Sequence, residues 1–217
     1  MTSDRSRKVS ELAVGKPRRI RGKPTPAHLD KLAEIKREAA RCFYDLGYAA
    51  TDVRTIADAV GLQVSTLYNY ISGKEELLYL IMKDGIVEIV DGLDEATTGL
   101  TDPTDRLRAA VRHHVLHHAH RQLRAWVGHV ELRALTGDYL AEIVGQRREY
   151  ERRWIAILDD GMRAGVFAPA DPQLTMYGIL AIGQNVSRWY KPGGEYDPEQ
   201  IADAMADLVL AGTLMRP

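Results

Sequence analysis

Most of the sequence consists of segments in which apolar residues recur every three or four positions, separated by glycine, proline or aspartate. This spacing is typical of amphipathic helices, whereas a half-buried strand would alternate strictly between apolar and polar residues. The sequence shows no convincing alternation, no internal repeat and no low-complexity tract. It therefore predicts an all-α protein.

The lengths of these segments divide the chain. A long helix ends at Gly47, a short second helix is capped by Asp52, and a third helix covers about residues 64–71. A fourth helix begins with Ser72 as its predicted N-cap, and five further helical segments follow. We predict an N-terminal three-helix domain over residues 28–80 and a C-terminal helical bundle over residues 81–217.

The second and third predicted helices have the spacing of a helix-turn-helix. Ala57 is small where the two helices would cross, Gly61 suits the positive φ of the turn, and Leu67 and Ile71 face inward. This arrangement presents the third helix to a DNA major groove.

The exposed side chains of this unit suit DNA. Asparagine can form two hydrogen bonds with adenine, valine can contact a thymine methyl group, and tyrosine hydroxyls and lysine can bind phosphate oxygens. The candidate DNA-contacting residues are Arg54, Gln63, Val64, Ser65, Tyr68, Asn69, Tyr70 and Lys74.

The run AATDVRTIADAVGLQVSTLYNYISGKEELL, preceded by a helix ending in FYDLGY, closely resembles the DNA-binding domain of the TetR family of transcriptional regulators. The resemblance implies a homodimer on a palindromic double-stranded operator, usually a repressor, which a small-molecule effector releases through the C-terminal ligand-binding and dimerisation domain. Three positions depart from the family pattern: Gln63 replaces a common serine, Asp52 a hydroxylated residue and Ile71 a phenylalanine.

Charge is unevenly distributed along the chain. The net charge is −1, yet residues 1–24 contain eight lysines or arginines and two acidic residues. Residues 25–84 contain seven basic and nine acidic residues. We interpret residues 1–27 as a flexible basic arm that supplies attraction to phosphates, with a solubilising tail as the alternative.

Two stretches of the bundle suggest an effector site. GQRREYERRWIAIL places Arg148 with Arg152, and Tyr150 with Trp154, on helical faces, and guanidinium groups bind phosphate or carboxylate. The alternative is a solvated arginine face with Trp154 in the core. SRWYKPGG resembles a segment of TetR-family regulators that respond to acyl-CoA thioesters, which implies an acyl-CoA or a lipid or aromatic effector. The candidate effector-binding residues are Trp126, Arg148, Arg152, Trp154 and Trp189.

The run RHHVLHHAH places His113 with His117, and His114 with His118, one helical turn apart, a spacing that can hold a metal ion. We favour buried or solvated imidazoles and expect no metal and no other cofactor. A metal-responsive regulator that uses the His113–His120 cluster, or a helical metal-binding or catalytic protein that has kept a helix-turn-helix, remains the alternative.

Other features restrict the class of protein. The single cysteine, Cys42, excludes an intrachain disulfide, and no apolar run approaches the roughly 18 residues of a membrane span. The N-terminal residues lack the apolar centre of a secretory signal. With no nucleophile motif and no glycine-rich phosphate loop, we expect a cytoplasmic non-enzyme without a membrane partner. Small residues at 171–190 and 197–214 allow helices to approach closely, either within the subunit or, as the resemblance to the TetR family implies, in a four-helix interface across a two-fold axis.

Deletion of residues 1–24 should lower the affinity for DNA and flatten its dependence on salt, because fewer phosphate contacts release fewer counterions. The measurement is fluorescence anisotropy of operator binding at several salt concentrations. An unchanged salt slope would reduce the arm to a tail.

Overall fold

The computed structural model describes residues 25–215, and within this range the chain is helical, without sheet strands. In chain order the elements are α1 (Pro26–Leu46), α2 (Val53–Ala59), α3 (Val64–Leu67), α4 (Lys74–Thr97), α5 (Pro103–His120), α6 (Gln122–Val130), the 3₁₀ helix η1 (Glu131–Ala134), α7 (Gly137–Arg163), α8 (Pro172–Trp189) and α9 (Pro198–Thr213). The predicted all-α fold is confirmed. The basic arm predicted over residues 1–27 lies, except for residues 25–27, outside the described part of the chain.

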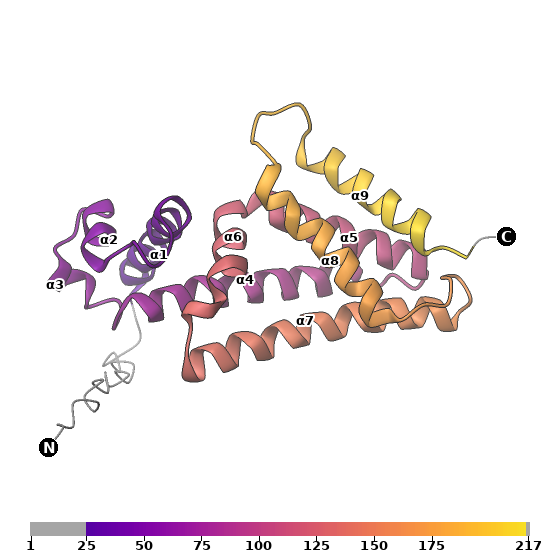
Figure 1. Cartoon of the computed structure of the whole chain (residues 1–217), viewed down its shortest axis with the longest axis horizontal. Coiled ribbons are helices and arrows are strands. Elements are labelled where there is room, and N and C mark those ends of the chain that lie inside the picture. Colours follow the sequence, from indigo (N-terminus) through magenta and orange to yellow (C-terminus); the bar gives the residue numbers. More distant parts are fainter. Residues whose placement is uncertain (1–24, 216–217) are drawn as a thin grey trace, which may run out of the picture.

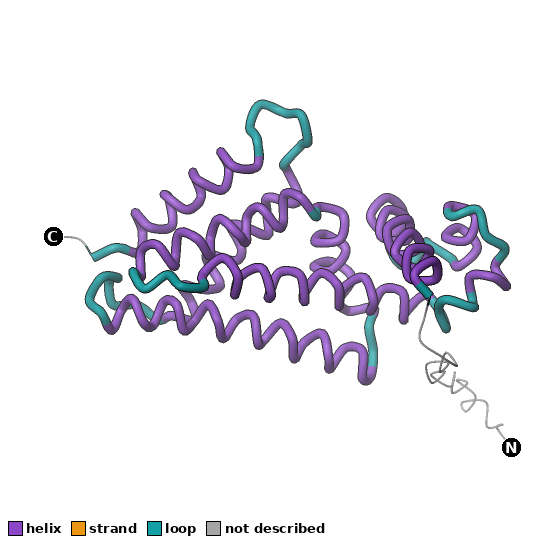
Figure 2. The backbone as a smooth tube through the Cα atoms, turned by 180° about the vertical axis from the view of Figure 1, so that it is seen from behind, coloured by secondary structure: helices purple, strands orange, loops and turns teal. Residues whose placement is uncertain are grey.

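The molecule is elongated, with the helix-turn-helix at one end (Figure 1). Helices α1, α2 and α3 form a small unit there, and α4 leads from it into the larger bundle. Helix α7 runs along one edge of the bundle and α9 along the opposite edge, and α8 crosses between them in contact with both, as the view from behind also shows (Figure 2). Helix α5 packs against both α8 and α9. Between residues 25 and 215, no helix has the length and apolarity needed to cross a membrane.

The ends of the first helices follow from their capping residues. Helix α1 stops at Gly47, which has a φ of 82°, and α2 begins after Asp52, whose side chain accepts a hydrogen bond from the Thr55 N–H. Gly61 has the positive φ expected of the turn, 65°. These features were predicted from the sequence.

Two boundaries were predicted wrongly. Helix α3 ends at Leu67 rather than near residue 71, because the N–H groups of Asn69 and Tyr70 bond to carbonyls three residues back, in tighter turns. The N-cap of α4 is Gly73 and not Ser72, and no side chain caps this end. The Ser72 N–H instead donates to the carboxylate of Glu76.

Three helices of the bundle begin in the same way. An aspartate precedes a proline at the start of α5, α8 and α9, and each aspartate side chain accepts hydrogen bonds from N–H groups of the first turn. The proline has no N–H to leave unsatisfied there, and its φ already suits a helix. The Asp-Pro pairs thus fix where these helices start.

The buried apolar residues form two cores, and α4 contributes to both. Leu77, Leu78 and Ile81 belong to the core of the helix-turn-helix unit, whereas Ile89 and Leu93 belong to the core of the bundle. The first core also includes Val127 of α6, Leu135 in the segment after η1, and Ile143 of α7. The predicted division after residue 80 therefore falls inside a helix that both units share.

Two neighbouring histidines of α5 fit against helical glycines on either side. A Cβ atom added at Gly92 of α4 would lie 2.2 Å from the His113 Cε1 atom. A Cβ atom added at Gly183 of α8 would lie 2.1 Å from the His114 Cδ2 atom. Helix α5 approaches both neighbours closely only because these positions lack side chains.

Gly183→Ala should lower the free energy of unfolding by about 1–3 kcal/mol, because the added methyl group overlaps a buried imidazole. Gly145→Ala is the matched control: Gly145 is also helical, with no atom within 4 Å of its added Cβ, so this substitution should stabilise by roughly 0.5–1 kcal/mol. Urea unfolding at one protein concentration measures both. Equal changes in the free energy of unfolding would contradict the close contact between Gly183 and His114.

Candidate DNA-binding surface and effector cavity

Helix α3 presents a polar face at the end of the molecule. Gln63, Ser65, Tyr68 and Asn69 are exposed, with 43% of the Tyr68 surface accessible, while Leu67 is fully buried beneath them. The Gln63 side chain makes no capping hydrogen bond to the start of the helix. Leu67 therefore fixes α3 to the core, and the polar groups of the exposed face are free to bind a partner.

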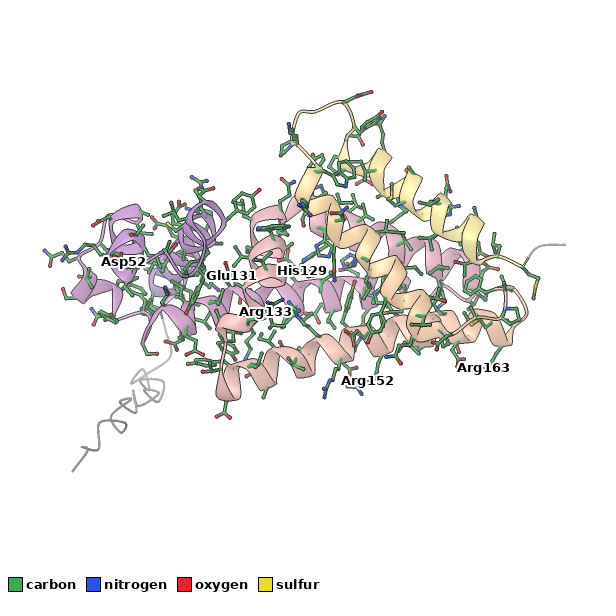
Figure 3. All side chains as sticks on the ribbon, viewed as in Figure 1. Asp52, His129, Glu131, Arg133, Arg152 and Arg163 are labelled. Atoms are coloured by element: carbon green, nitrogen blue, oxygen red, sulfur yellow. The ribbon has the colours of Figure 1, made fainter. Side chains whose placement is uncertain are left out.

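The other predicted DNA-contacting residues surround α3. Arg54 is exposed on α2, and Val64 is half-buried. Tyr70 is half-buried because its ring stacks on His28 of α1, with the ring centroids 4.5 Å apart. Exposed Asp52 (Figure 3) accepts hydrogen bonds from the backbone N–H and the hydroxyl of Thr55, and these bonds lower the pKa of its carboxyl. It therefore stays charged beside the DNA-facing surface.

Lys74 is placed differently from the phosphate contact expected of it. Its Nζ atom donates to the carbonyl oxygens of Tyr48 and Thr51, both at 2.7 Å, and lies 4.3 Å from the centroid of the Tyr48 ring. The ammonium group thus closes the loop between α1 and α2 onto the first turn of α4. In this structure it serves as an internal brace.

Two further hydrogen bonds join the helix-turn-helix unit to the bundle. The Tyr48 N–H donates to Glu131 of η1 at 3.1 Å (Figure 3). Glu75 of α4 accepts from the Thr136 N–H at 2.7 Å, just before α7. The start of η1 and the residue before α7 are therefore both tied to the unit that carries α3.

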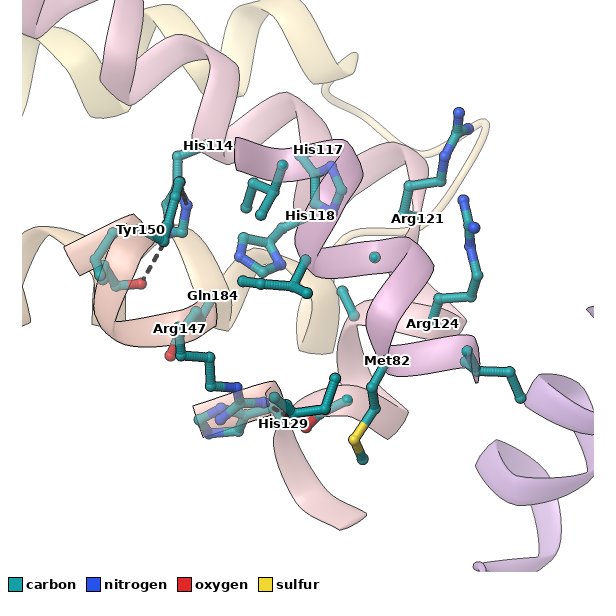
Figure 4. A pocket seen from close by; sticks show the side chains of 18 of the residues that line it. Met82, His114, His117, His118, Arg121, Arg124, His129, Arg147, Tyr150 and Gln184 are labelled. Atoms are coloured by element: carbon teal, nitrogen blue, oxygen red, sulfur yellow. Dashed lines mark hydrogen bonds between the residues drawn. The ribbon is translucent and has the colours of Figure 1, made fainter. Parts of the chain in front are cut away.

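A cavity of about 150 Å³ lies inside the bundle, between α4, α5, α6, α7 and α8 (Figure 4). Its apolar wall comes mainly from α4, through Ile81, Met82, Ile86 and Ile89. The polar lining groups are His114, His117, His118, Arg121, Arg124, His129, Arg147, Tyr150, Glu151 and Gln184. An apolar pocket with a few convergent polar groups is the usual form of a small-molecule site.

The hydrogen bonds of His114 settle which of its nitrogens carries the proton. Its Nε2 atom lies 3.2 Å from the carbonyl oxygen of Leu180, which can only accept, so Nε2–H donates. Nδ1 lies 2.9 Å from the Tyr150 hydroxyl and accepts from it. Burial lowers the pKa of His114 to about 3, so the imidazole is neutral.

The neighbouring histidines are also neutral. Burial lowers the pKa of His117 to about 4 and shifts that of His118 further in the same direction. Across residues 25–215, no three His, Cys, Asp or Glu side chains are grouped in a way that could hold a metal ion. The histidines instead give the cavity neutral hydrogen-bonding groups.

The structure does not gather the five sequence-predicted effector residues around this cavity. Trp154 is fully buried in the core of the bundle, and Arg152 points away from the outer face of α7 (Figure 3). Arg148 is also exposed, and the Trp126 ring lies 5.9 Å from the Arg188 guanidinium carbon. The fifth residue, Trp189 at the end of α8, is 45% exposed.

A signal for the lining of this cavity was present in α7. Ile143, Arg147, Tyr150 and Trp154 follow one another at intervals of three or four, so they share the helical face that carries the aromatic rings. If this face of α7 is taken to face the bundle, Arg147 lies on the side of the cavity and Arg148 on the side of the solvent. The sequence gives no comparable signal for the lining residues of α4, α5 and α8, because only the packing of these helices brings them together.

A second, wider groove of about 610 Å³ adjoins the cavity and shares Ile81, Arg121 and Arg124 with it. It continues along α1, past Lys36 and Arg37. Its other bordering residues include His120, Gln122, Tyr190 and Pro192. Two residues of the segment SRWYKPGG therefore border a basic groove between the DNA-binding unit and the bundle.

Comparison with known proteins agrees with this architecture. The family profile described as "Bacterial regulatory proteins, tetR family" matches residues 35–79, and the profile described as "Tetracyclin repressor-like, C-terminal domain" matches residues 100–213. The HTH-type transcriptional repressor KstR2 of Mycolicibacterium smegmatis is 28% identical over 181 residues, which are 82% of this chain and 88% of that protein.

Solved structures show the same likeness over most of the chain. A regulatory protein of the tetR family from Rhodococcus RHA1 has a TM-score of 0.81 and 30% identity, covering 86% of this chain and 98% of that chain. AibR, solved with isovaleryl coenzyme A and operator DNA, has a TM-score of 0.75 and 29% identity, covering 82% of this chain and 97% of that chain.

The helix-turn-helix, the helical bundle and its internal cavity define a DNA-binding transcriptional regulator. The chain belongs to the TetR family.

Lys74→Gln should lower the free energy of unfolding by about 1–3 kcal/mol, because two backbone carbonyls lose a charged donor. The affinity for DNA should fall with it. Thermal or urea unfolding, beside DNA binding, checks both, with exposed Lys191→Gln as the control. Unchanged stability with weaker DNA binding would instead assign Lys74 to a phosphate contact.

Proposed function

We propose that this chain is a homodimeric repressor that holds a palindromic operator with α3 and releases it when an anionic effector, such as an acyl-CoA or another lipid or aromatic acid, enters the bundle. It acts by binding and not by catalysis, in the cytoplasm, where operator DNA is found. The observation that carries this proposal is the cavity wall formed by α4, the helix that begins directly behind α3.

Helix α4 supplies a mechanical link between the two sites. Its residues Ile81, Met82, Ile86 and Ile89 line the cavity. Leu77 and Leu78, one turn earlier, are fully buried in the core of the helix-turn-helix unit. A ligand that shifts α4 must therefore move the unit that carries α3. Such a ligand weakens DNA binding to the extent that it prefers the shifted arrangement.

The shape and charge of the two hollows suit an acyl thioester. A cavity of about 150 Å³ is the size that accepts a molecule such as benzene, so it holds a short acyl group and not a nucleotide. The adjoining groove offers about 610 Å³ beside Lys36, Arg37, Arg121 and Arg124 for the anionic remainder. The complex of the similar AibR with isovaleryl coenzyme A supports this class of effector.

The outer face of α8 and α9 supports a dimer. Leu174, Tyr177 and Leu208 are 68%, 47% and 58% exposed, which is unusual for large apolar side chains that lie on neighbouring helices. The small residues of these helices fall into two sets: Gly183, Ala202 and Ala206 are buried within the subunit, and Gly178, Ala181, Ala204 and Ala211 are exposed. The exposed set would allow two copies to approach closely across a two-fold axis.

The test is fluorescence anisotropy with the intergenic DNA beside the coding sequence of this protein and unrelated DNA as competitor. The wild type should bind selectively, and Asn69→Ala should weaken binding by about tenfold or more, since one bidentate base contact contributes roughly 1–3 kcal/mol. Valeryl-CoA should release the DNA, whereas free CoA should not.

Arg124→Gln should make release by valeryl-CoA less sensitive, and Arg133→Gln should leave it unchanged, because Arg133 is exposed on η1 and does not line either hollow. If every acyl-CoA tested leaves the DNA bound, the effector class is wrong. If Asn69→Ala binds as the wild type does, the recognition surface lies elsewhere.

A further inference from the structure

Arg147 is a positive charge at the cavity that forms no close ion pair with another described residue. The residue is half-buried, and desolvation lowers the pKa of its guanidinium. One N–H donates to the carbonyl oxygen of Gly128 at 2.6 Å, and the guanidinium has five donors in all. Among residues 25–215 it forms no ion pair. A guanidinium held in this way favours an anionic partner, because an unpaired buried charge is costly.

His118 points to a ligand in the same cavity. The residue is 9% exposed, and within the described chain neither of its ring nitrogens has a hydrogen-bond partner. As a neutral imidazole it offers one donor and one acceptor. Its ring is held edge-on to those of His114 and His117, with centroids 4.5 Å and 5.6 Å away. Buried polar groups are rarely left unsatisfied, so this side chain is placed for a ligand oxygen.

The charges around the cavity favour an anion at the Arg147 side. Arg121 and Arg124 share Glu88, with N···O distances of 2.6 Å and 2.8 Å. Glu151 also lines the cavity, one helical turn after Arg147, and its carboxylate acts to raise the pKa of Arg147 without a close ion pair between the two. The three guanidiniums thus face two carboxylates.

The arrangement has two ends. Arg121 and Arg124 lie on one side of the cavity, where it meets the basic groove, and His118 and Arg147 lie across the hollow from them (Figure 4). A thioester whose CoA portion lies in the basic groove and whose acyl group enters the cavity from the first side would carry the far end of the acyl chain to the second. A plain alkyl end would leave His118 and Arg147 unsatisfied there.

We propose that the effector is a short ω-carboxyacyl thioester, whose terminal carboxylate is bound by the guanidinium of Arg147 and the imidazole N–H of His118. This inference rests on the proposed function, since it names the chemistry of the same effector. A short acyl group matches the volume of the cavity, about 150 Å³. Charge-assisted hydrogen bonds from Arg147 would distinguish it from an unsubstituted acyl chain of equal length.

The experiment compares glutaryl-CoA with valeryl-CoA by calorimetric titration of the full chain. The two acyl groups have the same number of carbons and differ only in the terminal carboxylate. The wild type should bind glutaryl-CoA about tenfold or more tightly, as expected for hydrogen bonds between charged groups. Arg147→Gln should remove this preference, so that the two thioesters bind with similar affinity.

Two further variants distinguish direct binding by Arg147 from a general change in the charge of the cavity. Arg147→Lys retains the charge without the planar fork and should keep part of the preference. Glu151→Gln is the control within the same helix: it should keep or increase the preference, because it removes a negative charge from the cavity. A preference lost in Glu151→Gln as well would contradict direct binding by Arg147.

The inference is overturned if the wild type binds glutaryl-CoA no more tightly than valeryl-CoA, or if Arg147→Gln weakens both equally. If neither thioester binds, the proposed effector class fails, and free glutarate against free valerate then decides the remaining question. Binding of glutarate that depends on Arg147 would support a carboxylate site in the cavity. Binding of neither acid would refute it.

Discussion

The structure depends on the burial of one helix in two cores. Helix α4 places Leu77 and Leu78 among the side chains of α1, α2 and α3, and Ile89 and Leu93 among those of the bundle. Between these pairs it forms a wall of the cavity. Because a helix with intact hydrogen bonds is nearly rigid over this length, the DNA-binding face and the cavity share one structural element. At its N-terminal end, Lys74 and Glu75 of α4 form hydrogen bonds with the loop between α1 and α2 and with Thr136 before α7. Glu131 of η1 accepts a further hydrogen bond from Tyr48 of the same loop.

Much of this fold could be predicted from local signals. The long helices follow from apolar periodicity, and their starts at Asp-Pro pairs follow from capping, because both depend on residues close in sequence. The same holds for the turn at Gly61 and the buried positions of Ala57 and Leu67. The end of α3 was misjudged because periodicity does not distinguish an α-helical turn from the tighter turns that follow it.

The cavity could not be predicted in the same way. Its walls come from five helices that are distant in sequence, and only their packing decides which side chains meet. Arginines at positions 147, 148 and 152 are chemically identical, yet the first lies inside and the others outside because α7 turns its aromatic face inward. Lys74 is a second example. Its position at the start of a helix suits a phosphate contact, but in the structure its ammonium group donates to two nearby backbone carbonyls.

The contacts of α5 with glycines also restrict how this sequence can change over evolutionary time. His113 and His114 occupy space that any side chain at positions 92 and 183 would need. A larger residue at either glycine is therefore acceptable only if the opposing histidine becomes smaller at the same time. Across descendants of this gene, positions 92 and 113, and positions 183 and 114, should covary as two pairs, and the second pair would carry a change on α8 directly into the cavity.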